Sequence, residues 1–122
     1  MKKILCVDDN DDILKLYIEI FGVRGYDTLV ATNDKDALSA MVAERPPVVL
    51  MDMVIGYGSL DGLDTARQIK KLYPETKILL ISGHLLDYER YSHEEKCLFA
   101  GMIAKPAKAD ELLRIVGEMF DE

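Results

Sequence analysis

Five short apolar runs alternate with longer amphipathic stretches along this chain. The runs contain mostly aliphatic and β-branched residues, with no alternation of apolar and polar positions. This pattern is typical of strands that are buried on both faces of a parallel sheet. The predicted strands are Ile4–Val7, Thr28–Ala31, Val48–Met51, Ile78–Ile81 and Met102–Ala104.

The stretches between the runs have helical spacing, because their apolar residues recur every three or four positions. These stripes are Ile13, Leu14, Tyr17, Ile20 and Phe21; Ala37, Leu38 and Met41; Leu63, Ala66, Ile69 and Leu72; and Leu112, Leu113, Val116 and Phe120. Gly25, Pro46-Pro47 and Pro74 stand where these helices should end.

Residues 84–99 have apolar residues at both ends and the polar segment "SHEEK" in the middle, and we predict a fourth helix there. With that helix, the pattern strand–helix occurs five times. It predicts one α/β domain over residues 1–122, with a parallel five-stranded sheet and five helices on both its faces.

Composition excludes several classes of partner. The chain has 122 residues and a formal net charge of −7, which argues against binding to nucleic acid or to an anionic membrane. The apolar runs are too short for a transmembrane span or a signal peptide. Cys6 and Cys97 are interpreted as small buried hydrophobic residues and not as a disulfide. We therefore expect a cytoplasmic protein.

Polar side chains follow four of the five predicted strands. In an open α/β sheet, ligands bind outside the carboxyl ends of the strands, so these side chains should meet at one rim. They are Asp8 and Asp9 after the first strand, Asp52 after the third, Ser82 and Gly83 after the fourth, and Lys105 and Pro106 after the fifth.

Each of these residue types has a chemical use. The carboxylates of Asp8, Asp9 and Asp52 can share one hard cation such as Mg²⁺, which prefers oxygen ligands. A carboxylate held beside a metal, as we expect for Asp52, can act as a nucleophile toward phosphorus. Lys105 offers a cation and Ser82 a hydroxyl to the resulting phosphoryl oxygens, while Gly83 leaves room beside them.

Together these motifs resemble the receiver domain of two-component response regulators, and the resemblance covers the whole chain. It implies a flavodoxin-like, doubly wound sheet in the order 2-1-3-4-5. It also implies that a sensor histidine kinase, a phosphotransfer protein or a small phosphodonor phosphorylates Asp52. By the same resemblance, Asp9, Asp52 and the backbone carbonyl of Val54 hold Mg²⁺, with Asp8 acting through water.

The resemblance further implies that Lys105 and Ser82 bind the phosphoryl group and that the Lys105–Pro106 bond is cis. The residues at Val54 and His84 then set the lifetime of the phosphoryl group. The output face, formed by helix 4, strand 5 and helix 5, binds a downstream protein. The chain thus acts as a phosphorylation-dependent switch and not as an enzyme on a separate substrate.

Three features depart from the family pattern. Met102 stands where the family has an aromatic residue that turns inward on activation. The loop "DMVIGYGSLDG" from Asp52 to Gly62 is about two residues longer than the common form and lacks its Met-Pro pair. The fourth helical stretch is unusually polar. The phosphorylation site is complete in the sequence, whereas the elements that read it are atypical.

Three alternatives remain open on the sequence. A phosphorylation-independent, receiver-like adaptor would use the atypical output face and ignore the site. A phosphohydrolase that forms an aspartyl phosphate typically has a second Asp where this chain has Val54, and it needs a cap domain. A flavin carrier on the same fold would bind phosphate with hydroxyls and backbone donors, whereas Asp8 and Asp9 would repel it.

Overall fold

A five-stranded parallel sheet forms the centre of the computed structural model, which describes residues 2–52, 62–83, 89 and 91–121. The spatial order is β2-β1-β3-β4-β5, as predicted. The strands are β1 (Lys3–Val7), β2 (Asp27–Ala31), β3 (Val48–Asp52), β4 (Lys77–Ser82) and β5 (Gly101–Ala104).

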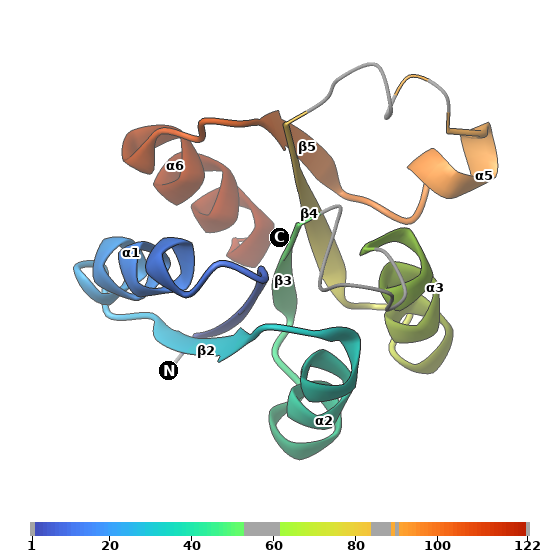
Figure 1. The fold of residues 1–122 in the computed structure, drawn as a ribbon, viewed down its shortest axis with the longest axis horizontal. Coiled ribbons are helices and arrows are strands. Elements are labelled where there is room, and N and C mark those ends of the chain that lie inside the picture. Colours follow the sequence, from blue (N-terminus) through green and yellow to red (C-terminus); the bar gives the residue numbers. More distant parts are fainter. Residues whose placement is uncertain (1, 53–61, 84–88, 90, 122) are drawn as a thin grey trace.

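Helices cover both faces of this sheet (Figure 1). In the described part of the chain they are α1 (Asp11–Gly22), α2 (Asp34–Glu44), α3 (Gly62–Leu72), α5 (His93–Lys96) and α6 (Ala109–Phe120). The helices α1 and α6 pack on one face, where Phe21, Leu112 and Val116 are fully buried. The helices α2 and α3 pack on the other face, where Met41, Ala66 and Ile69 are fully buried.

The helix ends follow local sequence signals. The side chain of Asn10 caps α1 by accepting hydrogen bonds from the backbone N–H groups of Asp12 and Ile13. Asn33 caps α2 in the same way through the N–H of Asp36, because an N-cap amide satisfies a free helix donor. Gly25, at φ 78°, takes the left-handed conformation where the chain turns after α1.

The edges of the sheet differ from the prediction that every strand is buried on both faces. β1 and β3 are almost completely buried, whereas β2 and β5 are the outer strands and are partly exposed. Val30 on β2 is 43% exposed. Apolar runs alone do not show which strands are at the edges. For a similar reason Leu72, assigned to the buried stripe of α3, is exposed at the end of that helix.

The predicted single helix over residues 84–99 is wrong in its described part. Ser92 has an extended backbone and begins the four-residue helix α5 as its N-cap. A capping box fixes this start, because the Ser92 side chain accepts from the N–H of Glu95 while the Glu95 side chain accepts from the N–H of Ser92. Residues 84–88 and 90 lie outside the described residues.

The two cysteines have different environments. Cys6 on β1 is fully buried, as predicted, and burial raises its pKa. Cys97, just after α5, is exposed, so the prediction that it is buried is wrong. None of the helices in the described part of the chain is long and apolar enough to cross a membrane.

This difference predicts selective alkylation. Iodoacetamide should modify Cys97 in the native protein and leave Cys6 unmodified, because burial excludes the reagent and disfavours the thiolate. Both cysteines should react in denaturant. Intact-mass spectrometry counts the adducts, and Cys97→Ser is the control that should show no adduct in the native state. Rapid native labelling of Cys6 would contradict the placement of β1.

Candidate functional site

The register of the sheet brings the predicted site residues to one rim. Val7 pairs with Met51, so Asp8 and Asp52 are the next positions on two neighbouring strands. Asp52 pairs with Ile81, which places Ser82 one position further along β4. Ser82 in turn pairs with Ala104, immediately before Lys105. Three neighbouring strand pairs therefore bring four polar side chains to the same rim, with Ser82 one position and Lys105 two positions beyond the level of Asp8 and Asp52.

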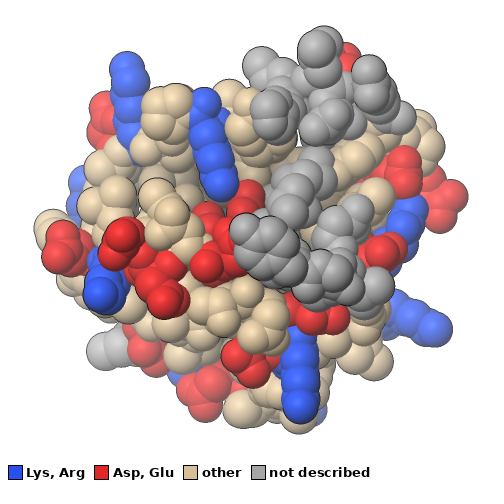
Figure 2. Space-filling view, in the orientation of Figure 1, with Lys and Arg blue, Asp and Glu red and all other residues tan. Residues whose placement is uncertain are grey.

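Three carboxylates lie together at this rim. Oxygen atoms of Asp8, Asp9 and Asp52 are all within 4.8 Å of one another. Asp8 and Asp52 are 2% and 8% exposed, whereas Asp9 faces solvent. In Figure 2, acidic side chains gather around the centre of the face shown, with a basic side chain beside them. Buried like charges this close require compensation.

Lys105 supplies part of that compensation. Its Nζ donates to Oδ1 of Asp52 at 2.9 Å and lies 3.6 Å from Oδ2 of Asp8. Burial of the ammonium lowers its pKa, but the hydrogen bond and charge of Asp52, together with Asp8, outweigh this and leave the pKa of Lys105 above its ordinary value. The lysine therefore stays charged and bridges both buried carboxylates. The Lys105–Pro106 bond is cis, as expected.

The environment of Asp8 disfavours the ionised form of its carboxyl group. Burial raises the pKa of Asp8, and the charges of Asp52 and Asp9 add to the rise. A hydrogen bond of 3.0 Å from the N–H of Asn10 and the charge of Lys105 act in the opposite direction. Since the folded protein binds this proton more tightly than the unfolded chain does, the free energy of unfolding falls as pH rises through the pKa of folded Asp8.

The carboxylate cluster fits a divalent cation. Three hard oxygen donors converge within the distance that one ion can bridge, and a single lysine faces them. A bound Mg²⁺ would offset the repulsion from Asp52 and Asp9, which adds to the rise in the pKa of Asp8 that burial causes. Asp8, Asp9 and Asp52 are thus the described residues that could hold it. Val54, whose carbonyl was expected as a further ligand, lies outside the described residues.

The remaining predicted residues occupy different positions. Ser82 is buried at the end of β4, and no described atom lies within 4 Å of where a Cβ on Gly83 would stand. Met102 on β5 is half-buried and packs against the core cluster that contains Leu80 and Phe99. His84 lies outside the described residues.

An apolar hollow beside the site was missed in the sequence. It has a volume of about 350 Å³ and is lined by Ile13, Leu16, Tyr17, Lys105, Pro106 and Ala107. Leu16 is 48% exposed and lies outside the buried stripe of α1. The position of this apolar residue outside the stripe was the signal in the sequence that could have indicated the hollow. Burial, with the nearby charge of Asp8, raises the pKa of Tyr17, so this wall of the hollow is uncharged.

Known proteins resemble this chain in sequence and in fold. The family model described as "Response regulator receiver domain" matches residues 4–117. Sporulation initiation phosphotransferase F of Bacillus subtilis is 34% identical over 112 residues, which cover 91% of this chain and 87% of that protein. The response regulator TrrA of Thermotoga maritima, solved with Mg²⁺-BeF, is 28% identical, with a TM-score of 0.84 and coverage of 98% and 99%.

One relative is much longer than this chain. The nitrogen assimilation regulatory protein NtrX of Azorhizobium caulinodans is 37% identical over 81 residues, which are 66% of this chain and 18% of that protein. The likeness to NtrX thus concerns one segment of a larger protein.

The carboxylate cluster predicts a metal-dependent stability. At pH 8, Mg²⁺ at millimolar concentration should raise the melting temperature relative to EDTA, because a ligand that binds only the native state stabilises it. Asp8→Asn should raise the melting temperature in EDTA by a few degrees and weaken the response to Mg²⁺, since it removes a buried charge from the cluster. Thermal melting followed by circular dichroism measures both.

Asp12→Asn is the matched control, because Asp12 is an exposed carboxylate outside the cluster. It should leave the response to Mg²⁺ unchanged. Melting curves that coincide in EDTA and in Mg²⁺ for the unaltered protein would rule out the metal site.

Proposed function

Because this chain belongs to the family of response regulator receiver domains, we propose that Asp52 accepts a phosphoryl group from a sensor histidine kinase or a phosphotransfer protein. Receiver domains are the phosphorylation-dependent components of two-component signalling, and this chain is homologous to them. The observation that supports Asp52 as the acceptor is its position at the end of a buried strand, within the carboxylate cluster and 2.9 Å from the Lys105 ammonium.

The transfer exchanges one bond to phosphorus for another. An oxygen of Asp52 attacks the phosphorus of a phosphohistidine, the bond from phosphorus to the histidine nitrogen breaks, and that nitrogen keeps the electron pair. Lys105, freed from its hydrogen bond to the attacking carboxylate, neutralises charge on the phosphoryl oxygens. The Ser82 hydroxyl donates to another of these oxygens. Asp9, Asp52 and the carbonyl of Val54, with Asp8 acting through water, would hold Mg²⁺, which when bound would supply further positive charge beside the phosphoryl oxygens.

The apolar hollow suits the docking of the phosphodonor protein. Lys105, which donates to Asp52, also lines the hollow together with Leu16 of α1, so the hollow lies next to the carboxylate that a donor histidine must reach. Burial of the exposed Leu16 side chain against an apolar surface of the donor would provide affinity next to the reacting atoms. We therefore assign this side of the rim to the donor.

The output face lies around β5. Met102, Lys108, Glu111 and Ile115 line a surface hollow of about 440 Å³ between β5 and α6. Methionine has flexible torsions and fills a pocket in several rotamers. Met102 is therefore poorly suited to switch between two distinct conformations. We propose that a downstream protein binds the face of α5, β5 and α6 and reads a change in the order or position of residues 83–98.

Several further assignments complete the proposal. Residues 1–122 act as one receiver domain in the cytoplasm, as a phosphoacceptor and not as an enzyme on a separate substrate. Val54 and His84, two positions after Asp52 and two after Ser82, tune the lifetime of the phosphoryl group, as the resemblance to receiver domains implies. The alternative of an adaptor that ignores phosphorylation is not favoured, because the carboxylate cluster and its lysine are complete.

Phosphorylation has a direct test. Incubation with acetyl phosphate and Mg²⁺ should add one group of about 80 Da, and Asp52→Asn should abolish the addition while Asp12→Asn retains it. Rapidly quenched intact-mass spectrometry makes the measurement. The same phosphodonor without Mg²⁺ should give little product. An unmodified spectrum for the unaltered protein would favour the adaptor.

Donor docking has a separate test. Leu16→Asp should slow phosphoryl transfer from a phosphorylated histidine phosphotransfer protein by roughly fivefold or more, because it places a charge in an apolar interface. It should not change the rate with acetyl phosphate, which needs no such contact. Val42→Asp is the matched control, since Val42 is 65% exposed on α2. Equal slowing by both variants would contradict donor docking at the hollow.

A further inference from the structure

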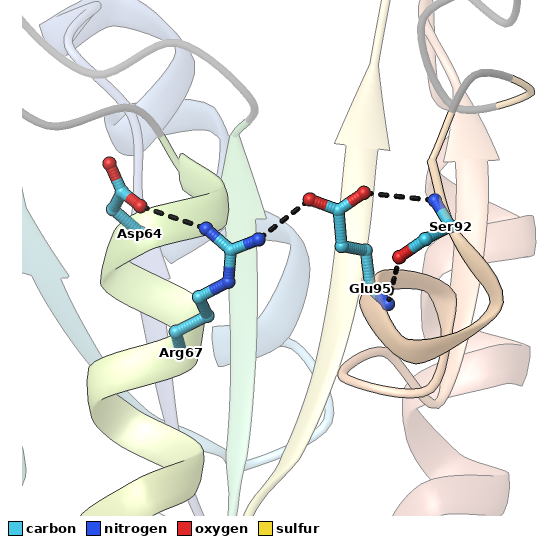
Figure 3. A network of polar contacts seen from close by, with 4 residues as sticks. All are labelled: Asp64, Arg67, Ser92 and Glu95. Carbon is cyan, nitrogen blue, oxygen red and sulfur yellow. Dashed lines mark hydrogen bonds and ion pairs between the residues drawn. The ribbon is translucent and has the colours of Figure 1, made fainter.

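A polar network outside the phosphorylation site joins α3 to the start of α5 (Figure 3). Nη1 of Arg67 on α3 donates to Oδ1 of Asp64 at 3.0 Å, and Nη2 donates to Oε2 of Glu95 at 2.6 Å. The other oxygen of Glu95 accepts from the N–H of Ser92 at 2.9 Å. One guanidinium therefore holds the same carboxylate that forms the capping box of α5.

The helix α5 needs such support. It has only four residues, and none of them is buried. Helices of this length are unstable in isolation, because nucleation costs more than one turn of hydrogen bonds returns. The capping box satisfies its first turn, and Arg67 ties Glu95 to another element. The hydrogen bond from Ser92 and the charge of Arg67 lower the pKa of Glu95, which keeps this carboxylate ionised and able to bind both partners.

The opposite side of the network is fixed. On α3, Ala66 and Ile69 are fully buried, and Leu63 is 9% exposed. All three belong to the same core cluster as Met51, the residue before Asp52. The helix α3 therefore provides a rigid support, whereas α5 is held mainly at its ends and by polar contacts.

The position of α5 affects the proposed output face. Tyr91 and Phe99 flank the helix and stack with ring centroids 6.4 Å apart. Phe99 is buried, and Met102 packs against the same core cluster. A shift of α5 away from α3 would move these aromatic side chains and change the surface beside Met102.

We propose that Arg67 is a positioning residue that latches α5 onto α3 and thereby opposes the phosphorylated state of the receiver. This inference rests on the proposed function. Ser82 is the last residue of β4, and α5 lies on the chain segment that leads from it to β5. A phosphoryl group that takes the Ser82 hydroxyl as a partner acts on one end of this segment, while the latch holds the other end. Binding at Asp52 and closure of the latch therefore compete, and the coupling is reciprocal.

The expected size of the effect is modest. Arg67 and Glu95 have side chains 48% and 24% exposed, and exposed ion pairs contribute little unless they form a well-aligned network. A latch of this kind shifts a two-state equilibrium by about two- to fivefold. The ion pair therefore shifts the populations of the two states and does not hold the protein in one of them.

The experiment compares hydrogen exchange and beryllofluoride binding in the same variants. Arg67→Gln should speed exchange of the amides of residues 92–98 by about two- to fivefold and lower the Kd for beryllofluoride, in Mg²⁺, by a similar factor. Glu95→Gln should act in the same direction, because Gln still completes a capping box but loses the ion pair. Arg67→Lys should restore values close to those of the unaltered protein.

The matched control is Arg114→Gln. It breaks an Arg–Glu contact of 3.3 Å between exposed side chains within α6 and should change neither measurement. Exchange in residues 92–98 that is unchanged in Arg67→Gln, or beryllofluoride affinity that is unchanged or weaker, would overturn the latch. Failure of the unaltered protein to bind beryllofluoride would instead contradict the proposed function, and with it the coupling.

Discussion

Two carboxylates buried side by side at the end of a parallel sheet are the constraint on which this structure depends. Asp8 and Asp52 follow paired positions of β1 and β3, so the register that aligns the apolar core also brings the two charges together. Their repulsion is offset by the ammonium of Lys105, which reaches both of them from the end of β5. The sheet therefore assembles the site, since Asp8, Asp52 and Lys105 come from the ends of three different strands.

This electrostatic balance explains why the rim is suited to phosphoryl transfer. The site holds negative charge that is only partly compensated, which favours binding of a divalent cation. A phosphoryl group on the acceptor would bind the same cation. Lys105 already contacts Asp52 and can pass to the phosphoryl oxygens without a large movement of its backbone. In the proposed function, the neighbouring apolar hollow, with Leu16 at its wall, would give the donor protein an apolar contact surface that does not add to the charge of the site.

On the proposed output side, the interactions that hold the structure differ from those at the carboxylate cluster. The four-residue helix α5 is held by small contributions: a capping box, one stacked aromatic pair and one ion pair to α3. Segments with little buried apolar area open at low cost in free energy. A switch needs this property, because a modest change at Asp52 must be able to redistribute the population of output states. In the proposed function, the rim around Asp52 binds the phosphoryl group and the weakly held α5 reports it.

The sequence by itself indicated the strands, four of the helices and the residues that the structure brings to the rim, because each is a local signal. Buried strands give continuous apolar runs, helices give a three-to-four periodicity, and Asp8, Asp52, Ser82 and Lys105 each directly follow or end a strand. Tertiary structure decided what depends on neighbours in space. It made β2 and β5 edge strands, exposed Leu72 and Cys97, and interrupted the predicted fourth helix at Ser92. It also paired Arg67 with Glu95 across 28 positions of sequence, since no local pattern specifies which side chain lies opposite another once two helices have packed.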